Sequence, residues 1–377
     1  MDDNFLISCM ECGHVCDYKN QKKCKNCNSE WIDATYNLPP KNNNKPLISN
    51  ISSMWRYKRL LPIKNVNNIV TLDEGWTPIL RLNYLEKQLG LKKILVKDER
   101  KNPTSTFKDR QASMIISNLK NINIGKLVAC STGNVAVSYA AYCAKANIKF
   151  SAFLPDGVSD NKIKKIINYG SEVHNVSGNY DEAKKIAKNY AIKNNIYYDE
   201  GTSLLYNREA KKTIAYEIAE QLEWKVPDWY IQAVSGGSGP MGVWKGFKEL
   251  QSIGLIKKIP KIACVQANGC SPMVDSFINN LKKATPVVPS TSIITLSTGD
   301  PGMSYIFLRK YITETGGTMV KVTEDTAEKI ADYLIEKEDL YMCHAAATAF
   351  GGLYKLSKDG IISKDSTVIV NCSGGNL

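Results

Sequence analysis

The chain has 377 residues, 43% of them hydrophobic and 23% charged, and its 49 basic and 37 acidic residues give a formal net charge of +12. This length accommodates about two domains with a substantial core, and the apolar fraction excludes a disordered chain. Apolar runs are far shorter than the roughly 18–20 residues that a membrane-spanning helix needs, and the first residues show no secretory signal. We expect a cytoplasmic protein without a membrane partner.

The first 27 residues contain five of the eleven cysteines. Four of them form two Cys-x-x-Cys pairs, namely Cys9, Cys12, Cys24 and Cys27. The short loop between the pairs lets four thiolates converge tetrahedrally on Zn²⁺. A segment with so little aliphatic core gains most of its folding free energy from such a metal. We predict a structural zinc ribbon over residues 1–32, with Cys16 and His14 as bystanders.

Residues 39–53, rich in Asn, Lys and Pro, are expected to form a linker. Beyond them, short β-rich runs alternate with helical patterns. The expected strands cover 93–97, 127–130, 150–154, 229–234, 262–265 and 368–370. Apolar residues at three- and four-residue steps predict helices over 181–194 and 210–222. This alternation is typical of an α/β fold with mostly parallel sheets.

Ligands of such folds bind at the carboxyl ends of the strands, and three predicted strand ends carry polar loops that open into helices. Loop 102–110 places Lys108 at a helix start, where the helix dipole disfavours an ammonium and favours a reactive amine. Loop 131–134, Ser-Thr-Gly-Asn, offers N–H groups and an amide to an anionic oxygen. Loop 235–239, Ser-Gly-Gly-Ser-Gly, is typical of a phosphate cradle. Taken singly, each pattern also fits a surface lysine, an ordinary helix cap or a packed turn.

Taken together, the loops resemble those of fold-type-II pyridoxal-phosphate (PLP) enzymes, which share the tryptophan synthase β-like fold. Within that group the chain resembles threonine synthase of the archaeal type, which carries an N-terminal zinc ribbon. Besides the three loops, the matching segments are 55–57, 73–78, 178–181, 212–217, 244–247 and 265–267. The resemblance implies a two-domain, three-layer α/β architecture behind the ribbon. Its large PLP-binding domain would cover 33–125 and 215–377, and its small domain 126–214.

The resemblance also implies roles for individual residues. Lys108 would bind PLP covalently and then shuttle protons, Asn134 would bond the 3′-oxygen of PLP, and Ser373 would face the pyridine nitrogen. The PLP phosphate would be bound by Ser235, Gly236, Gly237, Ser238 and Gly239. The residues implied for the substrate are Ser131, Thr132 and Gly133, which would hold its carboxylate, and Thr202, Asn207 and Arg208.

Departures from the threonine synthase pattern concentrate around the substrate. Ser105 and Thr106 stand where the lysine loop usually has Gly and Ser. The family's phosphate-binding arginine is replaced by Asn207, with Arg208 one position later. Because an Arg–phosphate bond is charge-assisted, its loss together with other polar contacts would weaken O-phosphohomoserine binding by roughly 10²–10⁴-fold.

A further departure lies near the carboxyl end of the chain. Cys343 and His344 stand in a segment that approaches the cofactor in the family, so a substrate contact stays open for both.

We therefore predict a PLP-dependent lyase or synthase of amino-acid metabolism that eliminates or replaces a leaving group at Cβ or Cγ. Its substrate would be an amino acid, possibly phosphorylated, and the resemblance suggests a homodimer. The first hypothesis is the threonine synthase reaction, which turns O-phosphohomoserine into threonine and phosphate. The alternatives are β-replacement on O-phosphoserine, as in cysteate synthase, and a serine or threonine dehydratase.

A non-enzymatic alternative is a zinc-ribbon protein that uses its basic surface to bind RNA. The lysines, however, are dispersed beside acidic residues, as in segment 181–185, which is typical of a solvated surface. Nucleic acid is therefore the less favoured partner.

Overall fold

The computed structural model describes residues 5–16, 23–37 and 50–375. Its contacts divide the chain into two compact units, each made of two stretches. The first unit contains Met1–Trp76 and Lys108–Thr213, and the second contains Thr77–Phe107 and Ile214–Leu377. The domain bounds expected from the resemblance stay a prediction, and most of the expected linker over 39–53 lies outside the described residues.

The N-terminal part of the first unit is a small antiparallel sheet. Its strands are β1 (Phe5–Cys9), β2 (Val15–Cys16) and β3 (Ile32–Tyr36), in the order β2-β1-β3. Alternate residues of β1 are buried, as expected for a strand with one face on a core. Because β3 continues to Tyr36, this sheet extends beyond residue 32, where we expected the ribbon to end.

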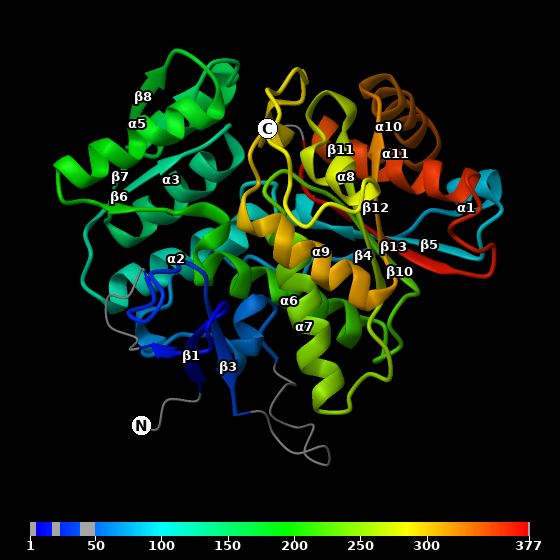
Figure 1. The fold of residues 1–377 in the computed structure, drawn as a ribbon, viewed down its shortest axis with the longest axis horizontal. Coiled ribbons are helices and arrows are strands. Elements are labelled where there is room, and N and C mark those ends of the chain that lie inside the picture. The colour runs from blue at the N-terminus through cyan, green and yellow to red at the C-terminus, as the bar shows by residue number, and fades with distance from the viewer. Residues whose placement is uncertain (1–4, 17–22, 38–49, 376–377) are drawn as a thin grey trace. The chain divides into compact units, whose positions relative to one another are not determined.

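The rest of the first unit is a parallel sheet with the strand order β8-β7-β6-β9. Its strands are β6 (Lys126–Cys130), β7 (Lys149–Pro155), β8 (Glu172–Val176) and β9 (Tyr197–Tyr198). Its helices are α2 (Lys108–Asn121), α3 (Asn134–Ala146), α4 (Asp160–Asn168), α5 (Tyr180–Lys193) and the first part of α6 (Leu205–Gln221), with 3₁₀ turns η2 (Met54–Leu60), η3 (Val66–Asn68) and η5 (Gly201–Ser203). Helix α5 packs on one face of the sheet, and α3 and α2 lie on the other (Figure 1).

The second unit is built on a six-stranded sheet with the order β12-β11-β10-β13-β5-β4, in which only β4 is antiparallel to its neighbour. Its strands are β4 (Ile79–Arg81), β5 (Lys93–Asp98), β10 (Trp229–Ala233), β11 (Lys261–Ala267), β12 (Thr318–Val322) and β13 (Thr367–Cys372). All five residues of β10 are buried, as expected for a parallel strand covered on both faces.

The helices of this unit surround that sheet. They are α1 (Asn83–Leu89), α7 (Ser238–Ser252), α8 (Pro272–Ile278), α9 (Met303–Thr315), α10 (Glu324–Glu338) and α11 (His344–Lys358), with η4 (Glu99–Lys101), η6 (Asn268–Cys270), η7 (Ile294–Leu296) and the end of α6. Helix α11 crosses β10, β11, β12 and β13, whereas α7 and α9 pack together and reach β11. Trp244 of α7 stacks on Tyr311 of α9 with ring centroids 3.7 Å apart.

The predicted α/β class with parallel sheets is confirmed. Each of the six expected strands is present, with ends shifted by no more than two residues. Helix α6 begins at Leu205, five residues before its expected start at 210. Its first turns contain buried polar residues, among them Asn207 and Arg208, and these interrupt the apolar periodicity that marks a helix in the sequence.

The matching segment 55–57 meets the first part of segment 73–78 in the core of the first unit. The Glu74 carboxylate is fully buried and accepts hydrogen bonds from Trp55 Nε1 at 2.9 Å and Tyr142 Oη at 2.7 Å. Burial raises the pKa of Glu74. These motif residues therefore stabilise the fold around α2 and α3 rather than forming a reaction site.

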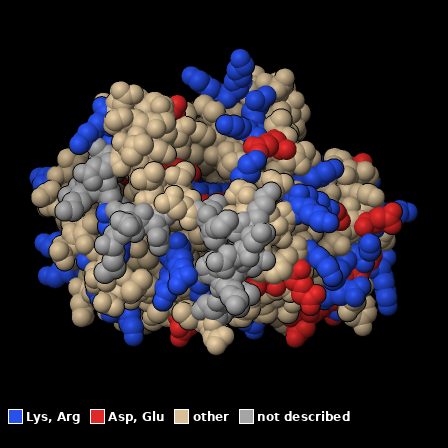
Figure 2. Space-filling model, turned by 90° about the horizontal axis from the view of Figure 1, so that it is seen from below, with Lys and Arg blue, Asp and Glu red and all other residues tan. Residues whose placement is uncertain are grey.

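Lysine and arginine side chains are scattered over the face shown in Figure 2, with acidic side chains among them. Within the described ranges, no helix is long and apolar enough to cross a membrane.

Candidate active site

Lys108 is the first residue of α2 and follows the loop that leaves β5. The end of this loop is attached to the segment after β13. The backbone N–H of Phe107 donates to the carbonyl of Ser373 at 3.0 Å, and the Thr106 hydroxyl donates to the same carbonyl at 3.2 Å. The predicted pyridine-facing residue Ser373 is therefore fixed beside the chain neighbour of the predicted cofactor lysine.

Ser105 adopts φ +56°, in the left-handed region that glycine enters without strain. The resemblance described above implies glycine at this position, and a serine adopts this conformation at some cost. The Ser105 carbonyl accepts the N–H of Gly375 at 2.9 Å, and Cys343 donates its N–H to Gly374 at 3.1 Å. Cys343 thus lies at the segment that supports the lysine loop, whereas His344 begins α11.

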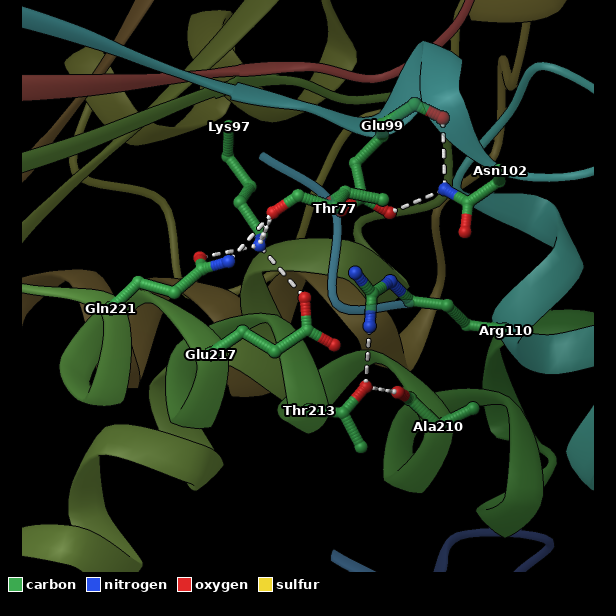
Figure 3. Close-up of polar contacts among 9 residues, drawn as sticks. All are labelled: Thr77, Lys97, Glu99, Asn102, Arg110, Ala210, Thr213, Glu217 and Gln221. Carbon is green, nitrogen blue, oxygen red and sulfur yellow. Dashed lines mark hydrogen bonds and ion pairs between the residues drawn. The ribbon is translucent and has the colours of Figure 1, made fainter. Parts of the chain in front are cut away.

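Two buried polar groups hold the beginning of this loop (Figure 3). Lys97, on β5, forms an ion pair with Glu217 of α6 at 2.8 Å, and neither side chain is exposed. Lys97 also donates to Gln221 at 2.9 Å. Glu99 accepts hydrogen bonds from the Thr77 hydroxyl at 2.7 Å and from Asn102 Nδ2 at 2.9 Å. The path from β5 toward Lys108 is therefore fixed by interactions inside the second unit.

The amine of Lys108 lies in surroundings that favour its neutral form. Desolvation lowers the pKa of Lys108 to about 8, although the carboxylate of Asp199 raises it in part. The side chain is nevertheless half-buried rather than inaccessible. A lysine with such a pKa is largely available as a nucleophile or base just above neutral pH.

The Asp199 carboxylate belongs to a hydrogen-bonded network in the first unit. Asp199 accepts a hydrogen bond from Tyr139 Oη at 2.8 Å, and Gln111 Nε2 donates to that Oη at 3.0 Å. Gln111 Oε1 accepts from the buried Lys211 ammonium at 2.6 Å. Burial lowers the pKa of Lys211, and the charge of Lys108 lowers it further. The two lysines and Asp199 therefore form one electrostatically coupled group.

Sequence reasoning missed this network. Asp199 follows β9, which is only two residues long and too short for a periodicity signal. Lys211 lies four residues, about one helical turn, after Asn207 on α6. This spacing places both side chains on one face of the helix and could have indicated that they interact.

The loop between β6 and α3 contains the second group of predicted residues. The Ser131 hydroxyl accepts hydrogen bonds from the backbone N–H groups of Gly133 at 3.0 Å and Ala136 at 3.1 Å. Gly133 has φ +120°, a conformation that L side chains rarely adopt, and this favours glycine; a Cβ would in addition displace the Lys162 side chain, whose Cδ would be 2.6 Å away. Asn134 then begins α3, and its buried Oδ1 has no hydrogen-bond partner among the described residues.

The third loop, between β10 and α7, lies in the second unit. Gly237 precedes α7 with φ +83°, which is readily available to glycine. A Cβ on Gly239 would approach Gln232 Nε2 to 2.3 Å, so the absence of a side chain lets the helix start closely against β10. Backbone N–H groups in the first turn of a helix have no intrahelical acceptor and suit a phosphate. The Ser235 hydroxyl lies 2.5 Å from that of Thr298.

The predicted substrate residues Thr202, Asn207 and Arg208 lie together at η5 and the start of α6. Asn207 Nδ2 donates to the carbonyl of Gly201 at 3.0 Å, and Asn207 Oδ1 accepts from Lys211. Arg208 donates to the carbonyl of Thr202 at 2.7 Å. The Arg208 side chain is only 3% exposed, an arrangement that disfavours the predicted substrate contact of this residue.

The four predicted zinc ligands converge. Their Sγ atoms all lie within 4.8 Å of one another, with 3.5 Å between Cys9 and Cys27 and 3.6 Å between Cys12 and Cys24. Four thiolates at about 2.3 Å from Zn²⁺ would stand about 3.8 Å apart, so the donor set fits the metal. A hydrogen bond with the Asn26 side chain contributes most to lowering the pKa of Cys12 to about 6. Cys16 Sγ instead faces the carbonyl of His14 at 3.5 Å.

The structure distributes the predicted residues over both units. The first contains Lys108, loop 131–134, the α6 residues and the four cysteines, whereas the second contains loop 235–239 and Ser373.

Residues 70–374 match the family described as pyridoxal-phosphate dependent enzyme, so the chain belongs to that family. Within it, the chain is 34% identical to threonine synthase of Methanocaldococcus jannaschii over 99% of its own length and 92% of that protein. It is 30% identical to threonine synthase of Halalkalibacterium halodurans over 86% of this chain and 90% of the relative. These relatives identify it as a threonine synthase-like PLP enzyme.

Solved structures share the fold. Threonine deaminase isoform 2 from Solanum lycopersicum superposes with a TM-score of 0.69 at 21% identity, covering 90% of this chain and 95% of that one. Diaminopropionate ammonia lyase from Escherichia coli gives a TM-score of 0.71 at 17% identity, covering 87% and 90% of the two chains.

The residues present fit PLP. Asn134 stands at the start of α3, where its Nδ2 would donate to the 3′-oxygen of PLP, and its buried Oδ1 has no partner among the described residues. The glycine-lined start of α7 suits a phosphate, and the lowered pKa of Lys108 suits covalent attachment to an aldehyde.

Proposed function

We propose that this protein catalyses the threonine synthase reaction, in which O-phosphohomoserine and water give threonine and inorganic phosphate. The observation that carries the proposal is Lys108, whose amine stands at the start of α2 with a pKa of about 8. The loop that leads to Lys108 is hydrogen-bonded to Ser373, because the Phe107 N–H donates to the Ser373 carbonyl. The threonine synthases that match nearly the whole chain support the same reaction.

In this proposal PLP is attached to Lys108, with Asn134 at its 3′-oxygen, loop 235–239 at its phosphate and Ser373 at its pyridine nitrogen. When bound, PLP supplies an electron sink that acidifies the substrate Cα–H. Lys108 Nζ accepts the Cα proton and returns protons later in the reaction. Over the whole reaction the Cγ–O bond breaks and phosphate departs with the bonding electrons, Cβ loses one proton and Cγ gains one, and water gives its hydroxyl to Cβ and its second proton to the released phosphate; the Cα proton is returned to Cα.

The amino-acid part of the substrate would be held by loop 131–134. Backbone N–H groups at the N-terminal end of α3 suit its carboxylate. The distal phosphate would lie toward η5 and the start of α6, where the resemblance implies an arginine and this chain has Asn207.

The experiment compares amino acids and O-phospho-amino acids as substrates of the holoenzyme. O-Phosphohomoserine should yield threonine and inorganic phosphate in equal amounts, and Lys108→Ala should abolish both. Lys101→Ala, at an exposed lysine of the same loop region, is the matched control and should retain activity. Absence of threonine and phosphate with the wild-type enzyme would refute the proposed reaction.

A second candidate is β-replacement on O-phosphoserine, as in cysteate synthase. Asn207 favours this reaction. Its side chain is hydrogen-bonded to Gly201 and Lys211 and has no positive charge to offer the distal phosphate of O-phosphohomoserine. A substrate shorter by one methylene places its phosphate differently. If O-phosphoserine with sulfite releases phosphate and O-phosphohomoserine does not, this second reaction replaces the first.

We also propose that the four-cysteine cluster binds one structural Zn²⁺ and that the protein is a cytoplasmic homodimer. The sulfur geometry supports the metal. The dimer is supported by the resemblance alone, and sedimentation analysis tests it.

A further inference from the structure

Arg208 connects the N-terminal sheet to the loop that precedes α6. One guanidinium nitrogen, Nη1, donates to the carbonyls of Thr202 and Ser203, each at 2.7 Å. The other, Nη2, donates to the carbonyl of Ile32 and lies 3.4 Å from Met10 Sδ. All these contacts lie within the first unit. A single planar group therefore holds two segments that are far apart in sequence.

The partners of Nη2 belong to the frame of the cysteine cluster. Ile32 pairs with Cys9 in the register of β1 and β3. Met10 follows Cys9 directly, and its N–H donates to the Trp31 carbonyl at 2.8 Å. The guanidinium carbon also lies 5.1 Å from the centroid of the Trp31 ring, at cation–π distance. The position of Arg208 thus depends on the backbone that presents Cys9.

The next residues of α6 form a second connection to the same strand. Tyr36, at the end of β3, donates its hydroxyl proton to the Glu209 carboxylate. Glu209 pairs with Lys212 at 2.7 Å, and both side chains are fully buried. The Lys212 ammonium lies 3.7 Å from the centroid of the Tyr36 ring. The start of α6 is therefore held against β3 by buried charged groups. Such groups are stable only when their hydrogen bonds and ion pairs are well aligned.

We propose that Arg208 is a positioning residue through which zinc occupancy of the cysteine cluster fixes the loop 201–203. Zinc would hold Cys9, at the end of β1, against Cys24 and Cys27, which precede β3, and would thereby keep the Ile32 carbonyl opposite Cys9 in place. Without that acceptor the buried guanidinium loses a partner and shifts, and the Thr202 and Ser203 carbonyls lose their donor. The consequence for substrate rests on the proposed function, in which this loop lies at the distal phosphate.

The direct test is hydrogen exchange of the full-length holoenzyme, analysed by mass spectrometry with and without zinc. Chelation of zinc should accelerate exchange in the peptide covering 200–206 at least tenfold, while α3 and α5 keep their protection. Equal exchange of 200–206 in both states would overturn the proposal. Acceleration throughout the first unit would also overturn it, because zinc would then stabilise the unit as a whole.

Two variants identify Arg208 as the connection. Arg208→Met should retain one zinc per chain, exchange 200–206 at least tenfold faster than wild type, and respond no further to chelation. Arg208→Lys keeps the charge but loses the two-sided fork, and should behave similarly. Arg59→Met, at an exposed arginine of the same unit, is the control and should match wild type. If chelation accelerates exchange equally in Arg208→Met and wild type, another route carries the effect and the proposal fails.

Kinetics separate this inference from the proposed reaction. Arg208→Met should raise KM for O-phosphohomoserine at least tenfold, with kcat within twofold and the visible absorbance of bound PLP unchanged. Faster hydrogen exchange of 200–206 with an unchanged KM would support the link between zinc and the loop. It would also show that this loop does not belong to the proposed substrate site.

Discussion

Lys108 owes its proposed reactivity to its surroundings. In water a lysine has a pKa near 10.4, so its amine is almost fully protonated at neutral pH. Desolvation at the start of α2 lowers the pKa of Lys108 to about 8, against the opposing charge of Asp199. Burial penalises the charged form, which is the form that cannot attack an aldehyde.

The rate at which apoenzyme captures PLP should therefore rise with pH and level off above about pH 8, rather than near pH 10. Asp199→Asn should move the midpoint to lower pH, since the Asp199 carboxylate raises the pKa of Lys108. The rate is followed by stopped-flow absorbance of PLP binding. Asp156→Asn, at an exposed site, should leave the midpoint where it is in wild type. An unchanged midpoint in Asp199→Asn would contradict the assigned influence of this carboxylate.

Helix α6 contributes different faces along its length. Its first turns contact β3 through Arg208 and Glu209, while Asn207 and Lys211 face the network near Lys108. Its last turns belong to the second unit, where Glu217 pairs with Lys97 of β5. The apolar periodicity of α6 is weak in its first turns, because paired charges are buried there beside the apolar side chains.

Breaking the Lys97–Glu217 pair on one side should destabilise the protein strongly. Glu217→Gln leaves the fully buried Lys97 ammonium without its carboxylate, which costs about 3–5 kcal/mol. The thermal midpoint should fall by roughly 4–6 °C, measured by calorimetry, because the entropy of unfolding of a 377-residue chain is about 0.8 kcal/mol/K.

Replacing both partners should restore most of that loss. In Lys97→Met/Glu217→Leu neither charge of this pair is left buried without the other; Gln221 loses the Lys97 donor, but its Nε2 still donates to the Thr77 carbonyl at 3.0 Å. The control is Asp325→Asn, which breaks the exposed Lys329–Asp325 pair and should shift the midpoint by only about 1 °C or less. A double variant no more stable than Glu217→Gln would show that the pair itself contributes net stability.

At the scale of the whole molecule, the net charge is +12, and the basic side chains on the face shown in Figure 2 are scattered rather than clustered in one patch. Acidic side chains lie among the basic ones on the face shown in Figure 2, and several lysines pair with neighbouring carboxylates, such as Lys355 with Asp359 at 3.0 Å. A protein that tracks a phosphate backbone needs clustered cations that release counterions together.

We therefore expect the holoenzyme to bind short single-stranded RNA only weakly, with no measurable binding at about 0.15 M salt. Fluorescence anisotropy of labelled RNA measures this. Tight binding with a steep salt dependence would support the RNA-binding alternative. The same preparation, assayed for PLP absorbance, shows whether both properties reside in one protein.

The sequence alone predicted those features that local patterns encode. Buried parallel strands such as β10 are mostly apolar runs, polar glycine-containing loops such as 131–134 and 235–239 follow the strands, and closely spaced thiols mark a zinc knuckle. These signals depend on residues within a few positions of one another. They sufficed for the α/β class and the convergence of Cys9, Cys12, Cys24 and Cys27, whereas the PLP family was predicted from a resemblance over most of the chain.

Only the tertiary structure decided what the buried polar residues contact. Arg208 could be interpreted from sequence as a substitute for a phosphate-binding arginine, yet its guanidinium reaches Ile32, 176 positions away. Asp199 and Tyr139, separated by 60 positions, likewise left no pattern. A buried charge takes whichever partner the packed chain brings within hydrogen-bond distance, and no periodicity or spacing in the sequence records that choice.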